Sequence, residues 1–339
     1  MRARRLRAGL RGWGGVGAMA VVCALAALFA LLLPLTQGDG DGSTGVGGPG
    51  LADGTRVRAE ECEDPQDLSL APSAAEGASV AAIRKRGYLS VGVDQNSYRW
   101  GYRNPNSTEK DVQLEGFDID LARRIADDLL GSPDKIRFKA IPTNQRVPAI
   151  QSGRVDMVVR TMTITCSRLE QVAFSAPYFL TGQQVLAPVS STVEGYDDTL
   201  AGTRVCSAAG STAYDKLDAD RKSGELDASA DISTTVPNQL DCLVRLQLGL
   251  VDAVVTDGAL AASQAAQDPT VELKGERFTT EYYGVAMNRK ATDLVRRVNR
   301  ILEQYRVDPD GWRASYDKWL GPTLGADSES ATPPVPKYK

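Results

Sequence analysis

The stretch TMTITCSR, at positions 161–168, places four hydroxyl groups, a cysteine and an arginine shortly after an apolar run. The guanidinium of Arg168 offers a planar set of donors that matches a carboxylate, and Thr163 and Thr165 add hydroxyls and backbone amides. Thr161 begins the same stretch. These residue types fit a site that holds an anion, although a solvated arginine at the start of a helical turn would also explain the spacing.

Further polar candidates stand where expected strands end. Asp257 closes the run VDAVVTD, where its carboxylate could face a ligand ammonium or cap the next helix. Ser211 and Thr212 lie between an expected strand and an expected helix, where backbone amides can bind an anion and a hydroxyl can act as a cap. Asp94 ends the first expected strand and could contact a ligand or cap a turn.

Three aromatic residues, Tyr98, Trp100 and Tyr102, alternate along the segment NSYRWGYRN. Residues at this spacing share one side of an extended chain, so they could form one wall of a pocket. Core packing or a β-hairpin explains the same pattern, and both alternatives stay open.

The composition excludes several classes of function. The chain has no histidine, which rules out Ser-His-Asp and Cys-His catalysis and argues against a transition-metal site. We therefore expect neither a metal nor a cofactor. The formal net charge of −4 becomes −9 once five arginines near the N-terminus are set aside, which argues against nucleic acid as a partner.

The N-terminus has the pattern of a membrane anchor. Five arginines precede an uncharged stretch from Gly14 to Leu35, and roughly 20 apolar residues are enough to cross a bilayer. Positive charge before the stretch predicts a cytoplasmic N-terminus and an extracytoplasmic remainder. A cleaved signal peptide and a secreted protein are the alternative.

The remaining chain alternates between strand and helix patterns, which predicts an α/β fold with parallel sheets. The phrases PAIQSGRVDMVVRT and VRLQLGLVDAVVTD share one plan, so two similar lobes should enclose a cleft. The expected parts are a leader and anchor at 1–35, a Gly-rich tether at 36–61, a first lobe at 62–184 plus 278–321, a second lobe at 185–277 and a disordered tail at 322–339.

Four cysteines lie beyond the apolar stretch, at positions 62, 166, 206 and 242. An even number of cysteines in an oxidising compartment predicts two disulfides, and four cysteines allow three connectivities. Their spacing matches no metal-binding motif.

Several motifs over about Gly87 to Gly321 resemble the extracellular solute-binding proteins of polar amino-acid ABC transporters. These are GFDIDLARRIADDL, MTITCSR followed by VAFSAPYF, VDAVVTD and YYGVAM, in the family's order. More narrowly, GVDQNSY, QRVPAIQSG and RTMTITCSR are similar to membrane-attached glutamate-binding members from Gram-positive bacteria.

The resemblance implies a two-lobe periplasmic-binding-protein fold of type II, the Venus flytrap. By the same resemblance, Arg168 would bind a ligand α-carboxylate with help from Thr161, Thr163 and Ser211, and Asp257 would pair with the α-ammonium. Within that fold Cys206 and Cys242 fall on a strand and a neighbouring helix of the second lobe, so we pair them. Cys62 is then left for Cys166.

The implied function is binding of a polar amino acid for delivery to ABC transporter permease subunits, by a monomer that is not an enzyme. Arginines are dense in the loops of the first lobe: Arg99, Arg103, Arg146 and Arg160. We therefore predict an acidic ligand, glutamate before aspartate, with glutamine or asparagine as the alternative. A membrane-tethered amino-acid sensor and a dehydratase are other functions that the same fold could serve.

Overall fold

The computed structural model describes residues 62–105 and 113–339. The expected anchor at Gly14–Leu35 and the tether at 36–61 lie outside these ranges. Within the described residues, no helix combines the length and apolar character needed to cross a membrane.

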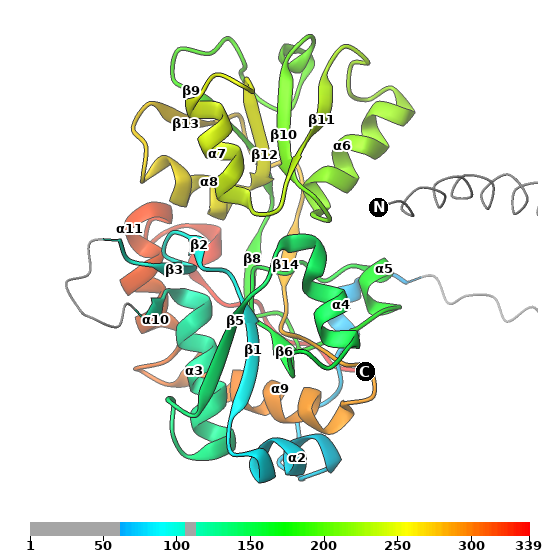
Figure 1. Ribbon diagram of the computed structural model, residues 1–339, viewed down its shortest axis with the longest axis vertical. Helices are drawn as coiled ribbons and strands as arrows, with labels where there is room; N and C mark the ends of the chain where they lie inside the picture. The colour runs from blue at the N-terminus through cyan, green and yellow to red at the C-terminus, as the bar shows by residue number, and fades with distance from the viewer. Residues whose placement is uncertain (1–61, 106–112) are drawn as a thin grey trace, which may run out of the picture. The chain divides into compact units, whose positions relative to one another are not determined.

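The first sheet has five strands and is mixed (Figure 1). Its order is β5 (Ile136–Ala140), β1 (Leu89–Val93), β6 (Met157–Val158), β15 (Ala286–Met287) and β7 (Ala173–Phe174). The strands β5, β1 and β6 are parallel, as the alternation of strand and helix predicts, while β15 runs antiparallel to both of its neighbours.

Alternate side chains of this sheet enter two separate cores. Val91, Met157 and Val159 pack into the larger core beneath helices α2, α3, α9 and α10, whereas Val158 and Ala286 face the smaller core beside α4. This period of two is the strand geometry that an apolar run with both faces covered requires. The helices are α2 (Ala78–Arg86), α3 (Phe117–Leu130), α4 (Arg146–Gln151), α5 (Cys166–Leu169), α9 (Thr292–Val307), α10 (Trp312–Trp319) and α11 (Gly321–Leu324).

The second sheet repeats the plan with five strands of the intervening chain. Its order is β11 (Asp231–Val236), β10 (Arg204–Ala208), β12 (Ala253–Asp257), β9 (Gln183–Pro188) and β13 (Val271–Lys274). Figure 1 shows α6 (Thr212–Ser223) on one side, and α7 (Gln239–Gln247) and α8 (Gly258–Ala265) on the other. Neighbours such as Val254 and Val255 accordingly enter different cores.

Two short antiparallel strands, β8 (Phe179–Thr181) and β14 (Glu281–Tyr283), run between the two sheets (Figure 1). They are the two crossovers of a two-lobe fold, since β9 follows β8 and β15 follows β14. A small three-stranded sheet consists of β2 (Asn96–Ser97), β3 (Gly101–Arg103) and β4 (Leu114–Glu115). Of the alternating aromatics, Tyr102 lies in β3, and Tyr98 and Trp100 lie in the turn between β2 and β3. The hairpin interpretation is therefore correct, and Trp100 is fully buried in the larger core.

Three strand assignments differ from the sequence analysis. The segments DISTTV and VELK form β11 and β13, two edge strands that were not predicted because each has too few apolar positions to give a strong signal. The segment YYGVAMN, whose apolar residues predict a single strand, is split at Gly284 into β14 and β15, which belong to different sheets. A Cβ at Gly284 would meet Ile164 at 2.9 Å.

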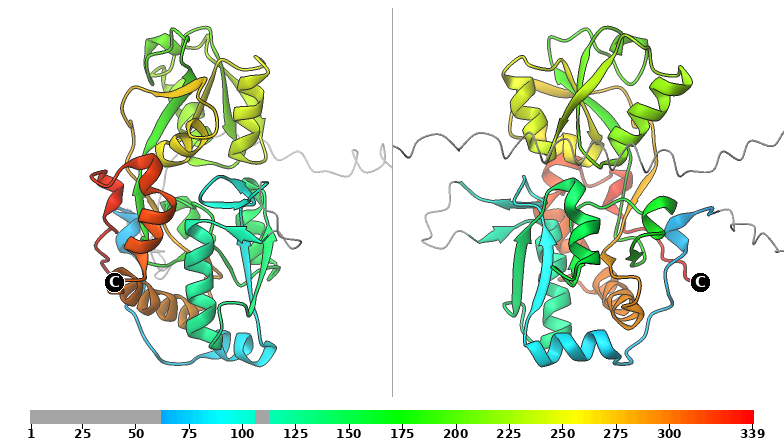
Figure 2. Two further views of the ribbon diagram at one scale, coloured as in Figure 1. Left: turned by 90° about the vertical axis from the view of Figure 1, so that its left-hand side faces the viewer. Right: turned by 45° about the vertical axis from the view of Figure 1, so that its right-hand side comes forward.

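The C-terminal tail also differs from the expectation of disorder. Ser330 and Ala331 are buried, and the amide of Lys339 donates to the carbonyl of Ser69 at 3.0 Å. Both views of Figure 2 place the end of the chain near α9, where the Tyr338 hydroxyl donates to Glu303. Contacts with other segments order this tail, and such contacts leave no local pattern in its own residues.

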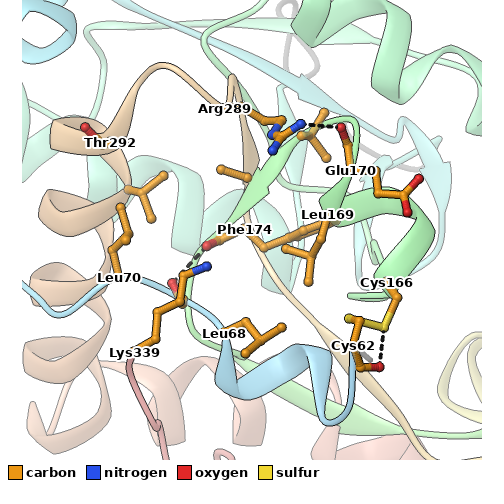
Figure 3. Close-up of a pocket in the computed structure, with 14 residues that line it drawn as sticks. Cys62, Leu68, Leu70, Cys166, Leu169, Glu170, Phe174, Arg289, Thr292 and Lys339 are labelled. Carbon is orange, nitrogen blue, oxygen red and sulfur yellow. Dashed lines mark hydrogen bonds between the residues drawn. A yellow bond between two sulfur atoms is a disulfide. The ribbon is translucent and has the colours of Figure 1, made fainter. Parts of the chain in front are cut away.

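The structure contains the two expected disulfides, Cys206–Cys242 and Cys62–Cys166. The first joins β10 to α7 within the second lobe. The second ties the N-terminal end of the described chain to the first residue of α5, beside a hollow of about 410 Å³ (Figure 3). Because Arg168 lies two residues further along α5, this bond restrains the loop that carries it.

A buried carboxylate also holds this loop. Thr161 has a left-handed backbone with φ of 40°, which is unfavourable for a β-branched residue, and its amide donates to Asp118 Oδ2 at 3.0 Å. The hydroxyl of Tyr178 donates to the other oxygen at 2.8 Å. Burial raises the pKa of Asp118 to about 7. Asp118 thus fixes the entry to the TMTITCSR loop from the first turn of α3.

Replacing Asp118 with alanine should lower the free energy of unfolding by about 2–4 kcal/mol, because the Thr161 amide and the Tyr178 hydroxyl would both be buried without an acceptor. Urea denaturation followed by circular dichroism measures this loss. The matched control is Asp127→Ala on the exposed side of the same helix, which should change stability by less than about 0.5 kcal/mol. Equal losses in the two variants would contradict the anchoring role of Asp118.

Candidate ligand-binding site

Arg168 is the centre of a buried polar cluster. Only 8% of the residue is exposed, and its guanidinium donates to two carbonyls, Thr163 O at 2.7 Å and Gly210 O at 3.2 Å. Among the residues that the structure describes, no carboxylate forms an ion pair with it. Burial lowers the pKa of Arg168, although Glu281, Asp215 and Asp257 partly offset this effect. The site therefore holds a desolvated cation whose charge is not directly paired.

The carbonyl of Gly210 links the two lobes at this point. It lies between β10 and α6, and it accepts from Arg168 and, at 3.4 Å, from Arg146 in the first lobe. Gly210 has φ of 75°, and an added Cβ would come within 3.0 Å of Asn144. Only glycine permits this backbone conformation and this close approach without strain.

Asp257 lies at the end of β12, as its position in the sequence predicts, and is also buried. The Tyr283 hydroxyl donates to its Oδ2 atom. Burial, and then the nearby charge of Glu281, raise the pKa of Asp257 from 3.8 to about 8. The residue precedes α8 without a side-chain capping hydrogen bond, so its carboxylate is directed to the cluster and not to the helix.

Glu281, in β14, connects the threonines of both lobes. Its Oε2 atom accepts from Thr163 Oγ1 at 2.6 Å and from Thr212 Oγ1 at 3.0 Å, and its Oε1 atom accepts from Gln183 Nε2 at 2.5 Å. Only 6% of Glu281 is exposed. Neighbouring Ser211 acts as the N-cap of α6, where its hydroxyl accepts from the amide of Tyr214. The structure therefore brings Thr163, Thr212 and Asp257 together around Arg168.

Arg160 and Asp94 form a second buried pair. Arg160 is fully buried, and its Nη2 atom lies 2.8 Å from Asp94 Oδ2. The same guanidinium donates to Thr143 Oγ1 at 3.0 Å and, in the second lobe, to Asn238 Oδ1 at 3.1 Å. Its Nε atom is buried without a hydrogen-bond partner. Asp94 also accepts from Ser97 and from two amides of its turn, so it caps the turn as expected, and its contact with a ligand stays a prediction.

Arg146 is buried beside these two arginines. It donates to four backbone carbonyls: Thr143 O at 2.9 Å, Arg160 O and Thr161 O at 3.3 Å, and Gly210 O at 3.4 Å. Burial, and then the charges of Arg168 and Arg160, lower its pKa well below the usual value. The side chain of Arg146 therefore holds the backbone at residues 160 and 161, where the TMTITCSR loop begins.

Within the described residues, hollows open where the lobes meet. One of about 320 Å³ includes Arg168, Arg146, Gly210 and Asp215 in its lining. Another, of about 650 Å³, is lined by Asn96, Tyr98 and Tyr102 on the first lobe and by Leu240 and Gln267 on the second. The cleft is thus closed over the charged cluster and remains open at its margins.

Of the remaining candidates, Tyr98 and Arg103 line a hollow of the cleft, and Arg99 does not. Tyr98 lines the larger hollow, as proposed for a pocket wall. Arg99 lies apart from the cluster, because its guanidinium donates to the Trp319 carbonyl at 3.2 Å and lies 5.1 Å from the Tyr98 ring centroid. Arg103 lines the larger hollow with Tyr98.

Three residues of the cluster were not identified from the sequence: Glu281, Tyr283 and Gln183. Glu281 and Tyr283 alternate in the segment EYY directly before the motif Gly-Val-Ala-Met, and this spacing of two could have placed both on one side of a strand. Gln183 follows the turn glycine in TGQQVLAP. Nothing in its local pattern distinguishes it from Gln184.

The sequence is similar to that of known binding proteins over most of its length. It is 32% identical to the ABC transporter glutamine-binding protein GlnH of Bacillus subtilis, over 71% of this chain and 84% of that protein. It is 30% identical to the glutamate-binding protein GluB of Corynebacterium efficiens, over 75% of this chain and 84% of that protein.

Solved structures are similar as well. A solute receptor for L-cysteine of Neisseria gonorrhoeae has a TM-score of 0.67 at 27% identity, and the match covers 76% of this chain and all of that one. An ancestral arginine-binding protein bound to arginine has a TM-score of 0.61 at 35% identity, over 70% and 99%. The model of the bacterial extracellular solute-binding proteins, family 3, matches residues 89–322, and the chain belongs to this family.

Proposed function

We propose that this protein binds a free L-amino acid between its lobes, with the α-carboxylate on Arg168 and the α-ammonium on Asp257. The observation that carries this proposal is the buried guanidinium of Arg168, which has two carbonyl partners and no carboxylate ion pair among the described residues. A desolvated cation of this kind gains most from an anion that enters the site. Thr163 and Thr212 would add hydroxyl contacts.

Arg160 would meet the distal end of the ligand. Its unpaired Nε donor is buried, and the hydroxyl of Ser207 is buried without a partner in the same sheet as Asp257. A carboxylate at the end of the ligand side chain would complement that donor, which favours glutamate, then aspartate. The 30% identical glutamate-binding protein supports the same choice.

Glutamine is the second candidate ligand. The charge of Arg160 is already balanced by Asp94 at 2.8 Å, so a neutral amide that both donates and accepts would fit this pair without adding charge. Two similar relatives are named as glutamine-binding proteins. Calorimetry with glutamate, aspartate, glutamine and asparagine distinguishes the two candidates directly.

Delivery to an ABC transporter permease is the proposed role, because relatives over most of this length are ABC transporter binding proteins. The uncharged stretch at 14–35 would hold the protein at the extracytoplasmic face of the membrane. A tethered sensor would use the same anchor and the same closure. Uptake of labelled amino acid by cells with and without this gene tests for transport.

Arg168→Ala should weaken binding of the preferred amino acid about 30-fold or more, because the ligand carboxylate would lose its charged partner inside a closed cleft. A thermal-shift panel of the twenty amino acids identifies the ligand first. A micromolar ligand at millimolar concentration stabilises the native protein by about 4 kcal/mol.

The control for this variant is Arg204→Ala, which removes an exposed arginine that pairs with Asp252 in the second lobe. It should leave the affinity unchanged. If Arg168→Ala retained the thermal shift of the unaltered protein, the proposed role of Arg168 would be wrong.

Ligand affinity should also depend on pH near 8. The pKa of Asp257 is raised to about 8 in the closed cleft, and a bound ammonium would favour its ionised form. Binding below about pH 8 therefore releases a proton, and the affinity should fall by up to about tenfold per unit as the pH decreases toward about 6. Calorimetry in buffers of different ionisation enthalpy measures this release. An affinity that is constant over this range, without proton release, would contradict the assignment of Asp257.

A further inference from the structure

Glu281 is a buried charge that the family assignment leaves without a role. Its carboxylate is bound by donors from three segments: Thr163 in the first lobe, Thr212 at the start of α6 and Gln183 at the start of β9. Three neutral donors satisfy its oxygen atoms but do not cancel its charge. Among the described residues, no cation forms an ion pair with Glu281.

The strand β14 places this charge beside Asp257. Positions two apart in a strand face the same side, so Glu281 and Tyr283 both point toward the cluster. Tyr283 then donates its hydroxyl to Asp257, while Glu281 lies close enough for its charge to disfavour ionisation of Asp257. One crossover strand therefore supplies one carboxylate of the site and orients the other.

Most of the partners of Glu281 are attached to its own strand. Thr163 forms a β-bridge with Tyr283, and Gln183 follows β8, which pairs with β14. Of the two partners in the second lobe, Gln183 lies at the start of β9 directly after the crossover, and Thr212 reaches Glu281 from the start of α6. The carboxylate should accordingly keep its position when the lobes separate, so it is a permanent feature of the cleft wall and not a group that an entering ligand displaces.

Two neighbouring carboxylates in a closed cleft repel each other unless one of them is protonated or a cation lies between them. The charge of Arg168 offsets part of this repulsion, but its guanidinium forms an ion pair with neither carboxylate, since its hydrogen bonds go to Thr163 O and Gly210 O. An ammonium group has three N–H donors and can bind both carboxylates and one further acceptor.

We infer that Glu281 is a second carboxylate of the ammonium-binding end, which shares the ligand's α-ammonium with Asp257. This inference rests on the proposed function, and it identifies Glu281 as a specificity-determining residue. Two anionic partners require a primary ammonium, and they select against ligands in which the α-nitrogen is acylated or replaced by a keto oxygen.

The test is the variant Glu281→Gln, which keeps the size of the side chain and one oxygen acceptor but removes the charge. Calorimetry with the amino acid found in the thermal-shift panel should give an affinity about tenfold weaker or more. The pH at which affinity begins to fall should also shift downward, because Asp257 would titrate without the opposing charge. The other groups facing Asp257, namely the charges of Arg146 and Arg168 and the neutral hydroxyl of Tyr283, are unchanged in this variant, and so is Asp215, which faces Arg168.

Thr212→Val serves as the second variant, since it removes one hydrogen bond to Glu281 and leaves the charge in place. It should leave the pH profile where it is, which separates the charge of Glu281 from a merely structural effect. Unchanged affinity in Glu281→Gln, or tighter binding, would overturn the inference. Tighter binding would mean that Glu281 competes with the ligand carboxylate.

The Arg168→Ala variant distinguishes failure of this inference from failure of the proposed function. If that variant loses binding while Glu281→Gln keeps it, the amino-acid site stands and only the second carboxylate is wrong. If Arg168→Ala keeps full binding, the proposed function itself fails.

Discussion

The burial of like charges in one closed cleft is the constraint on which the rest of the site depends. Arg146, Arg160 and Arg168 lie together, and burial penalises each guanidinium. Backbone carbonyls satisfy Arg146 and Arg168, and Asp94 neutralises Arg160. Neither Arg146 nor Arg168 forms an ion pair among the described residues, but Arg146 has four carbonyl acceptors and Arg168 has two. Under the proposed function, Arg168 is therefore the arginine whose charge a ligand carboxylate would complement.

The surrounding structure holds the two carbonyls that accept from Arg168 in place. The Thr163 carbonyl is positioned by a loop that Asp118 fixes at one end and the Cys62–Cys166 disulfide restrains at the other. The Gly210 carbonyl comes from the second lobe and requires a glycine, because its φ of 75° and its approach to Asn144 exclude a side chain. A contact between lobes in which the acceptor is a backbone carbonyl is sensitive to small shifts of either loop. Closure can therefore respond to what occupies the cleft.

Much of this fold could be predicted from the sequence, and the failures have physical reasons. Helix α3 and strands β1, β6 and β12 have strong patterns, and from them followed the position of Asp257 at the end of β12 and of the TMTITCSR loop after β6. The edge strands β11 and β13 lack that pattern. The C-terminal tail is ordered by contacts with distant segments, and those contacts leave no trace in its local composition.

The site was harder to predict because two of its members depend on the crossovers. Glu281 and Gln183 are adjacent only because β8 and β14 pair between the lobes, and a local motif does not reveal such pairing. Arg99, which we expected near the ligand, lies apart from the cluster for the opposite reason. It lies near the expected pocket in the sequence, but the hairpin of β2 and β3 directs it to the Trp319 carbonyl, so proximity along the chain was misleading.

The most direct test of the account uses ligands that each lack one charged group. Calorimetry would compare L-glutamate with 2-oxoglutarate, which has no α-ammonium, and with 4-aminobutanoate, which has no α-carboxylate. If Arg168 and Asp257 bind the two charges of the α-carbon, each analogue should bind at least about a hundredfold more weakly than glutamate. If either analogue bound within about tenfold of glutamate, the corresponding contact would not form, and the central claim would be contradicted.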